Sequence, residues 1–309
     1  QVMRSGIIGR GGGGGYYGGK LALKYTGRSA HEVIFFARGA HLAAIRKDGL
    51  RLVTVDGEYV VRPSQATDNP GEMGRLDLAL FCTKSYGLEE AARAVSRNLD
   101  YDSVVLPLLN GVDITDRLRA VLPQADVRYG GVFISCAIQG PGLVKQAGGT
   151  GQLFFGPGNP ADVEKHRPIE ALLKGAGIKA ELSADALLPL WTKYIFIGPM
   201  AGVTSLTGKP FGEVLAGAAE RAMVEGMMKE VEAVARKKGV HFPPDIVQAS
   251  LGKAAAFAPT TKTSMQLHYE RGNRTELDIF IAYMVKAGRE LGIPVPLHEK
   301  VFAELGKRG

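Results

Sequence analysis

The chain has 309 residues, of which 45% are hydrophobic and 22% are charged, and its formal net charge is +7 at pH 7. These proportions are typical of a soluble globular protein and exclude a disordered chain, a collagen-like chain and a small disulfide scaffold. The length is enough for two domains. Two cysteines, Cys82 and Cys136, lie in apolar runs. We expect them to be reduced thiols, which favours a reducing compartment, the cytoplasm.

Membranes, nucleic acids and metals are not expected partners. No uncharged stretch approaches the roughly 20 apolar residues that a membrane span requires, and the N-terminal sequence lacks the pattern of a secretory signal. The longest basic run is only Arg236 to Lys238, and it has no interleaved aromatic residues, so nucleic acid binding is not predicted. The histidines show no zinc-type spacing, so we predict no metal site.

In the first half of the chain, strand-like and helix-like segments alternate. The strand-like segments are near-continuous apolar runs, the pattern of strands that are buried on both faces. This alternation predicts an α/β domain, with a parallel sheet and helices on both faces. A local exception is expected at residues 52–61, where Asp56 and Gly57 lie between two β-rich runs and predict a hairpin. The expected strands are residues 6–8, 32–37, 76–83 and 103–109, and the expected helices are residues 16–24, 41–47, 88–98 and 112–122.

The pattern changes near residue 184. Residues 127–182 are β-rich and punctuated by glycine and proline, whereas the chain after residue 184 is helical without strand alternation. We therefore expect an α/β domain at residues 1–184 and an all-helical domain at residues 185–309. The helices expected in the second domain are residues 186–207, 212–239, 245–257, 274–291 and 296–305.

A glycine-rich turn follows the first expected strand and precedes a helix. Residues 9–14 satisfy the pattern G-x-G-x-x-G in the context that a dinucleotide-binding turn requires. In this pattern Gly9 allows the tight turn and Gly11 lets the backbone approach a pyrophosphate, while Gly14 lets the helix pack close to the strand. Gly12 lies in the same phosphate-binding turn, and the helix N-terminus supplies N–H groups to the phosphates. A glycine run matches this pattern easily, so the flanking strand and helix carry the prediction.

The end of the second expected strand indicates which dinucleotide binds. NAD sites usually place an acidic residue there to bond the ribose hydroxyls. This strand ends instead in Ala37 and Arg38. A guanidinium group suits a 2′-phosphate, so NADP(H) is the expected cofactor. The alternative is that Arg38 is an ordinary surface arginine.

Further short motifs follow the glycine turn in a fixed order. They are FFAR at 35–38, FCTK at 81–84, LLNG at 108–111, WTK at 191–193, TSM at 263–265 and TELD at 275–278. Together, over essentially the whole chain, they resemble the ketopantoate reductase (2-dehydropantoate 2-reductase) family. The resemblance implies a Rossmann-type NADP-binding domain followed by a helical substrate domain. It also implies NADPH-dependent reduction of the 2-keto group of 2-dehydropantoate to pantoate, in pantothenate biosynthesis.

The resemblance implies roles for three catalytic residues. Lys193 matches the family's catalytic lysine, which hydrogen-bonds the substrate carbonyl and donates a proton to it. Glu276 matches the active-site glutamate, although it would also form a capping box with Asn273. Asn110 ends the fourth parallel strand, at the edge where ligands bind. It matches an asparagine between the nicotinamide and the substrate, and a turn residue is the alternative.

Two further residues match positions that contact ligands in the family. Lys84 follows a strand end and matches a lysine near the cofactor and the active site. Ser264 matches a serine that binds the substrate carboxylate, and a loop hydroxyl is the alternative. The resemblance as a whole implies that the small-molecule substrate is a 2-keto acid.

The sequence departs from the family pattern at two positions that are expected to contact the substrate. Ile197 and Ala201 stand where the family often has asparagines, four and eight residues after Lys193 on the same helix face. This departure leaves open an NADP-dependent reductase of a different 2-keto acid. A third alternative is an NADPH-binding module with little turnover. The amphipathic segment 213–238 favours a possible homodimer, or else belongs to the core of one chain.

Overall fold

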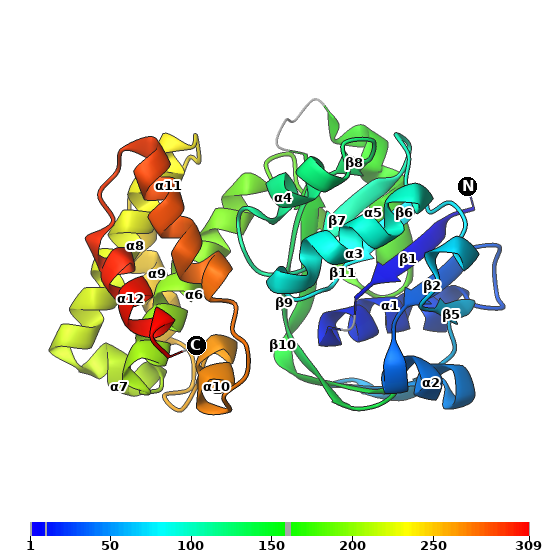
Figure 1. The fold of residues 1–309 in the computed structure, drawn as a ribbon, viewed down its shortest axis with the longest axis horizontal. Helices are drawn as coiled ribbons and strands as arrows, with labels where there is room; N and C mark the ends of the chain where they lie inside the picture. The colour runs from blue at the N-terminus through cyan, green and yellow to red at the C-terminus, as the bar shows by residue number, and fades with distance from the viewer. Residues whose placement is uncertain (1, 10, 158–161, 309) are drawn as a thin grey trace. The chain divides into compact units, whose positions relative to one another are not determined.

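The computed structural model describes residues 2–9, 11–157 and 162–308, which divide into two compact units (Figure 1). The first unit comprises Gln1–Asn110 and Ile114–Ala186, and the second comprises Gly111–Asp113 and Leu187–Gly309. Strands occur in the first unit, and the second is built from helices. This confirms the expected fold class, an α/β dinucleotide-binding type of domain plus a helical domain.

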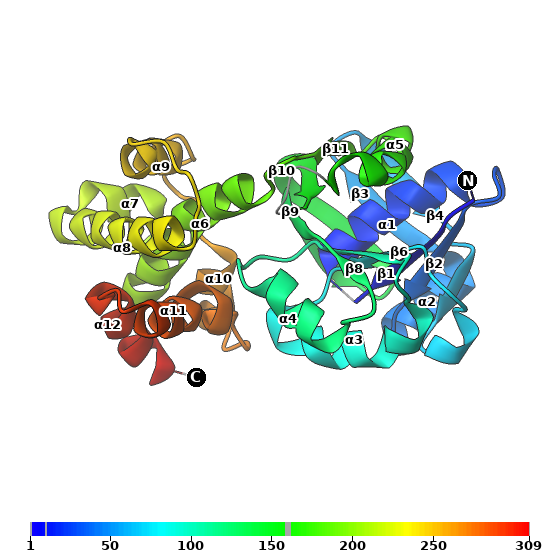
Figure 2. The same ribbon diagram turned by 90° about the horizontal axis from the view of Figure 1, so that it is seen from above.

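Six parallel strands form the main sheet of the first unit, in the order β5-β2-β1-β6-β7-β8. The central strands are buried along almost their whole length, as their apolar sequences predict. Figure 2 shows α3 and α4 on one side of this sheet and α1 on the other. The strands are β1 (Arg4–Ile8), β2 (Glu32–Phe36), β5 (Gln65–Thr67), β6 (Leu78–Phe81), β7 (Val104–Pro107) and β8 (Asp126–Val127).

A second sheet, which the sequence analysis did not predict, lies beyond α1. Its strand order is β11-β10-β3-β4, and β9 pairs with β10 in the antiparallel direction. The expected hairpin is its β3–β4 pair, but Thr54 pairs with Gly57, so the two loop residues are Val55 and Asp56. The strands are β3 (Leu50–Thr54), β4 (Gly57–Val61), β9 (Tyr129–Gly140), β10 (Leu143–Gly156) and β11 (Lys179–Leu182).

Helix α1 packs between the two sheets through small residues. A Cβ at Gly18 would lie 2.7 Å from Ile7 of the main sheet, and a Cβ at Gly15 would lie 2.5 Å from Val144 of the second sheet. The glycines therefore let both sheets approach the helix closely. The helices of the first unit are α1 (Gly12–Tyr25), α2 (Gly39–Asp48), α3 (Leu88–Val95), α4 (Ile114–Val121) and α5 (Arg167–Gly175).

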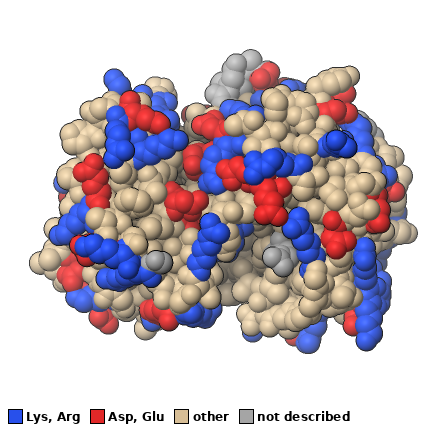
Figure 3. All heavy atoms as spheres, in the orientation of Figure 1, with Lys and Arg blue, Asp and Glu red and all other residues tan. Residues whose placement is uncertain are grey.

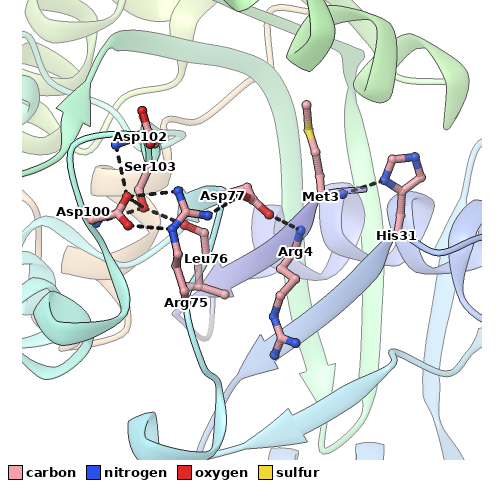
Figure 4. A network of polar contacts seen from close by, with 9 residues as sticks. All are labelled: Met3, Arg4, His31, Arg75, Leu76, Asp77, Asp100, Asp102 and Ser103. Atoms are coloured by element: carbon pink, nitrogen blue, oxygen red, sulfur yellow. Dashed lines mark hydrogen bonds and ion pairs between the residues drawn. The ribbon is translucent and has the colours of Figure 1, made fainter. Parts of the chain in front are cut away.

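A polar network holds the edge of the main sheet at which β1 begins (Figure 4). The backbone N–H of Arg4 donates to the carboxylate of Asp77 at 2.8 Å. The guanidinium of Arg75 pairs with Asp77 at 2.5 Å and with Asp100 at 2.6 Å. Hydrogen bonds from Arg75 lower the pKa of Asp100 to about 2. This edge lies at the other end of β1 from the glycine turn, so the network secures the sheet away from the candidate site.

The second unit is arranged around the long helix α6, against which α8, α9, α10 and α12 pack. The expected helix at residues 212–239 is two helices, because Gly217 adopts an extended conformation between them. The short α10 was not predicted. The helix expected at residues 274–291 opens with a π-helical turn, η6, which continues into α11. The elements are α6 (Leu187–Thr207), α7 (Phe211–Ala216), α8 (Ala218–Lys237), α9 (Ile246–Ala255), α10 (Ser264–Glu270), η6 (Asp278–Ala282), α11 (Tyr283–Leu291) and α12 (Pro296–Gly306).

The described residues show neither a membrane-spanning helix nor a metal-binding cluster. Across residues 2–9, 11–157 and 162–308, no helix combines the length and apolarity needed to cross a membrane. The same residues contain no group of three or more His, Cys, Asp or Glu side chains placed to hold a metal ion. On the face that Figure 3 shows, acidic side chains lie among the basic ones.

Candidate active site

The glycine turn joins β1 to α1 at the carboxyl edge of the main sheet. Gly9 has a φ of +118°, which a residue with a side chain rarely adopts, and a Cβ there would lie 2.8 Å from Thr83. The N–H of Gly11 donates to the carbonyl of Cys82 at 3.2 Å, and a Cβ on Gly11 would lie 2.3 Å from the same oxygen. A Cβ on Gly14 would lie 3.1 Å from Cys82. The turn is therefore held tightly against the end of β6.

The start of α1 also touches the second sheet. Helix α1 begins at Gly12, although the sequence analysis placed its start at Tyr16. A Cβ on Gly12 would lie 2.4 Å from the carbonyl carbon and oxygen of Cys136 in β9, whereas a Cβ on Gly13 would meet nothing within 4 Å. Close packing against β9 thus leaves no room for a side chain at position 12, whereas a side chain at position 13 would meet no neighbour.

The chemistry of this turn suits a dinucleotide pyrophosphate. The first N–H groups of a helix have no partner within the helix, and they carry the positive end of the helix dipole. The N-cap Gly11 has no side chain to cap them, and the first turn of α1 contains no acidic residue. In addition, the hydroxyl of Thr83 beside Gly9 is buried and has no hydrogen-bond partner among the described residues. Thr83 was overlooked in the sequence, although it belongs to the FCTK motif after a buried strand.

Arg38 lies two residues after the end of β2 and is the N-cap residue of α2. Its guanidinium is 3.2 Å from the carboxylate of Glu90, and both side chains are largely exposed. The same guanidinium lies 5.7 Å from the ring centroid of Phe36. Because exposed ion pairs of this kind contribute little to stability, Arg38 can exchange Glu90 for another anion. Arg10, the second residue of the glycine motif, lies outside the described residues.

Lys84 and Asn110 follow two other strands of the main sheet. Lys84 comes three residues after the end of β6 and Asn110 three residues after the end of β7, and both are half-buried. Since parallel strands end at the same edge of a sheet, these side chains belong to the edge that carries the glycine turn. The first unit thus presents the predicted cofactor residues along one sheet edge.

In the helical unit, three predicted residues lie along one face of α6. Lys193, Ile197 and Ala201 are spaced four residues apart, so they follow one another along the helix. Lys193 and Ile197 are partly buried, and Ala201 is buried. The departure from the family's asparagines therefore falls on the helix face that carries the lysine.

Glu276 is held near this face through its neighbours in the chain. It is 6% exposed. The hydroxyl of Tyr194 donates to the carbonyls of Ile279 and Phe280 at 2.8 and 3.0 Å, which ties α6 to the π-helical turn. The N–H of Phe280 in turn donates to the carbonyl of Glu276 at 3.4 Å. These bonds fix the backbone around Glu276 relative to the helix that bears Lys193.

The capping-box alternative for Glu276 is not observed. The helical segment formed by η6 and α11 opens at Asp278, its N-cap is Leu277, and no side chain caps it. The helix therefore begins after Glu276 instead of at Asn273. The π-helical hydrogen bonds displace the start from the position that the sequence pattern indicated.

The ammonium group of Lys193 lies in an unusual electrostatic environment. Burial lowers the pKa of Lys193 to about 8, and the ammonium of Lys253 acts in the same direction. The carboxylate of Glu276 opposes both effects. The structure therefore brings Lys193, Glu276 and Lys253 within electrostatic reach of one another, and Lys253 was overlooked in the sequence. A lysine with such a pKa is able to give up its proton near neutral pH.

Ser264 is the first residue of α10 and is exposed. The preceding residue, Thr263, caps α10 by accepting a hydrogen bond from the N–H of Gln266 at 3.2 Å. The hydroxyl of Thr263 also lies 3.0 Å from that of Thr204 on α6. The loop that carries Ser264 is therefore bonded to α6.

The predicted residues thus form two groups. The cofactor residues and Asn110 lie on the first unit, and the other catalytic and substrate residues lie on the second.

Comparisons with known proteins show which family the chain belongs to. The family model "Ketopantoate reductase PanE/ApbA" matches residues 5–160, and the model of its C-terminal domain matches residues 185–308. An uncharacterized oxidoreductase, YkpB of Bacillus subtilis, is 28% identical over 97% of this chain and 96% of its own length. A 2-dehydropantoate 2-reductase of Mesorhizobium japonicum is 29% identical, with the same coverage of each chain.

A solved structure of a family member has the same fold. The crystal structure of a PanE/ApbA family ketopantoate reductase from Ralstonia eutropha JMP134 superposes with a TM-score of 0.87 and 34% sequence identity, covering 99% of each chain. Two family models together span most of the chain, and a relative of this identity and coverage belongs to the same family. The chain is an oxidoreductase that belongs to the ketopantoate reductase family.

Proposed function

We propose that this chain catalyses the NADPH-dependent reduction of 2-dehydropantoate to pantoate, a step of pantothenate biosynthesis. The observation that carries the proposal is the pair formed by Lys193 and Glu276. A partly buried ammonium with a pKa of about 8 and a buried carboxylate act on each other in the helical unit. Family relatives named 2-dehydropantoate 2-reductase support this choice of substrate.

In the proposed reaction, Lys193 holds the keto oxygen of the substrate and gives it a proton. When bound, NADPH supplies the hydride that reduces the keto carbon. The alkoxide that develops on the oxygen is stabilised by the neighbouring ammonium, and the lowered pKa eases the transfer of its proton. Glu276 favours the charged form of Lys193, so the acid is protonated before reaction. Asn110, at the sheet edge of the first unit, is proposed as a further contact to the reacting groups.

The residues proposed to hold the cofactor lie at the carboxyl edge of the main sheet. The turn at Gly9, Gly11, Gly12 and Gly14 would receive the pyrophosphate, with helix N–H groups as donors. Arg38 would bind the 2′-phosphate of NADP(H), for which it must leave Glu90. Lys84 is a third proposed contact, at the end of β6.

A second candidate function is the reduction of a different 2-keto acid by the same chemistry. The observation that favours it is the partly exposed apolar side chain of Ile197, one turn after Lys193 on the same face of α6, while Ala201 further along is buried. Such a side chain suits an apolar substituent on the keto acid better than a hydroxylated one, because an unpaired hydroxyl would lose its hydrogen bonds to water.

The experiment is to measure oxidation of NADPH, and separately of NADH, by the purified protein with 2-dehydropantoate and a panel of other 2-keto acids. The proposal expects the highest kcat/KM for 2-dehydropantoate with NADPH. A higher kcat/KM on another keto acid would support the second candidate. Tight NADPH binding without turnover of any keto acid would contradict both and favour a binding module.

A further inference from the structure

The residues discussed so far leave one charge of the proposed substrate unmatched. A 2-keto acid carries a carboxylate beside the keto group, and a carboxylate that leaves water needs a charged or strongly donating partner. Lys193 is assigned to the keto oxygen, Glu276 is itself an anion, and Ser264 offers only a neutral hydroxyl. Ile197 and Ala201 offer no donor. Another positive group in the helical unit would match this charge.

Lys253 lies in the last turn of α9, which packs against α6. Its Nζ atom is 5.1 Å from the ring centroid of Phe196. Phe196 follows Lys193 by three residues, so the two side chains are neighbours on the surface of α6. A cation over an aromatic ring is attracted to the face of the ring, which holds this ammonium near Phe196.

The ring that holds Lys253 is itself fixed in place. Phe257 lies one turn after Lys253 and stacks on Phe196, with centroids 5.5 Å apart and ring planes inclined by 20°. Phe211 of α7 contacts both rings, at centroid distances of 6.4 and 5.6 Å. Three aromatic side chains from three segments thus define a wall beside Lys253.

The electrostatics show that the two lysines act on each other. Partial burial lowers the pKa of Lys253, and the residue remains exposed to solvent. Its charge also lowers the pKa of Lys193. The two ammonium groups repel each other, and an anion that lies near both would offset this repulsion. A 2-keto acid offers such an anion, since its carboxylate is bonded to the carbon that bears the keto oxygen.

We propose that Lys253 binds the carboxylate of the substrate and thereby selects 2-keto acids over uncharged ketones, while Lys193 holds the keto oxygen. This inference rests on the proposed function and adds a specificity-determining residue to it. The ring of Phe196 positions the Lys253 ammonium. If Lys253 only covered apolar surface with its methylene groups, its substitution would not change KM for the keto acid.

The test compares Lys253→Met and Lys253→Arg with the unmodified protein, on a 2-keto acid that the protein reduces and on the corresponding 2-keto amide. Methionine keeps the length and apolar body of the side chain and removes only its charge. Loss of one charge-assisted contact is expected to raise KM for the keto acid by about 10- to 100-fold, with kcat changed less than about threefold. KM for the amide should stay unchanged, and arginine should restore most of the keto acid affinity. Lys229→Met, on the exposed side of α8, is the matched control.

The outcomes separate this inference from the proposed function. Turnover of keto acids with the same KM in Lys253→Met would overturn the role of Lys253 and leave the function standing. If the unmodified protein reduces no keto acid, the proposed function fails, and the anion site is then measured by calorimetric titration with oxamate in the presence of NADPH. Weaker oxamate binding by Lys253→Met than by Lys253→Arg would support the site, and equal binding by both would contradict it.

Discussion

The hydroxyl oxygens of Thr204 and Thr263 lie 3.0 Å apart in the interior of the helical unit, where both residues are almost fully buried. Thr204 donates its own proton to the carbonyl of Met200 at 2.7 Å, so Thr263 is the donor between the two hydroxyls. Thr263 at the same time caps α10, whose first residue is Ser264. One hydrogen bond therefore joins α6, which bears Lys193, to the loop that bears Ser264, the predicted contact to the substrate carboxylate.

Substitution of Thr204 by valine removes this bond at nearly constant volume. We expect a loss of about 1–2 kcal/mol in the free energy of unfolding, because a buried hydroxyl loses its acceptor. If Ser264 contacts the substrate, KM should also rise several-fold while kcat changes little. Thr207→Val is the control, since Thr207 is half-buried and its hydroxyl bonds only within its own helix and the residues just after it. Equal effects of the two substitutions on KM would contradict the positioning role.

The role of Lys193 as the proton donor predicts a particular dependence on pH. The acid must be protonated, and its pKa in the free protein is lowered to about 8. The value of kcat/KM for reduction should therefore be constant well below pH 8 and fall about tenfold per pH unit well above it. Because Glu276 raises this pKa, Glu276→Gln should move the decline to lower pH. Because Lys253 lowers it, Lys253→Met should move the decline to higher pH. Steady-state rates from pH 6 to 10 check all three profiles.

The same role predicts the effect of removing the amine. Lys193→Met should lower kcat by about 10²- to 10⁴-fold, the usual contribution of a positioned acid. NADPH affinity should change little, since the proposed cofactor residues lie in the other unit. The control is Lys286→Met, an exposed lysine of α11 whose nearest anion is Glu290. A kcat for Lys193→Met within a few-fold of the unmodified protein would exclude Lys193 as the proton donor.

Two adjacent glycines should respond in opposite ways to alanine. At Gly12 a Cβ would lie 2.4 Å from the backbone of Cys136, so Gly12→Ala should lower the free energy of unfolding by about 2 kcal/mol or more. At Gly13 a Cβ meets nothing within 4 Å, and alanine favours the helix, so Gly13→Ala should be neutral or stabilising by up to about 1 kcal/mol. Urea denaturation of the two variants, side by side, measures both values. The packing account is wrong if Gly12→Ala is as stable as Gly13→Ala.

Arg38 and Glu90 together should set the preference for the 2′-phosphate. Arg38→Gln should weaken NADPH binding about tenfold and leave NADH binding unchanged, because only NADPH carries the extra phosphate. Glu90→Gln should strengthen NADPH binding by about two- to threefold, since it releases Arg38 from an exposed ion pair. Fluorescence titration with each dinucleotide provides the dissociation constants. Parallel losses for NADPH and NADH in Arg38→Gln would make Arg38 an ordinary surface arginine.

Much of the first unit was predictable because its strands are buried on both faces and read as apolar runs. The parallel sheet and the hairpin at Asp56 followed from these runs and from turn chemistry. The second sheet did not, because β9 and β10 are rich in glycine and β10 pairs with β3, which is distant in the sequence. The start of α1 was misplaced for a related reason. Gly12 and its neighbours disfavour a helix locally, and tertiary packing between two sheets overrides that tendency.

The candidate site was predictable only in part. The family resemblance led to Lys193 and Glu276, and the structure adds their electrostatic contact. Thr83 and Lys253 escaped the sequence analysis, because a hydroxyl after a strand and a lysine in a helix carry no distinctive pattern. The helix α10 also escaped it, since seven residues are too few to show helical periodicity. These features depend on which segments pack together in the fold, and a local sequence pattern does not show such tertiary contacts.

The central claim is that the protein delivers hydride to the keto carbon of a 2-keto acid, with Lys193 as the acid. The most direct measurement is the mass of the hydroxy acid formed from 2-dehydropantoate with NADPH deuterated at the transferable position of the nicotinamide. The account predicts one deuterium, bonded to the carbon that carried the keto group, and a loss of this product in Lys193→Met. A hydroxy acid without deuterium, or equal product from Lys193→Met, would contradict the account.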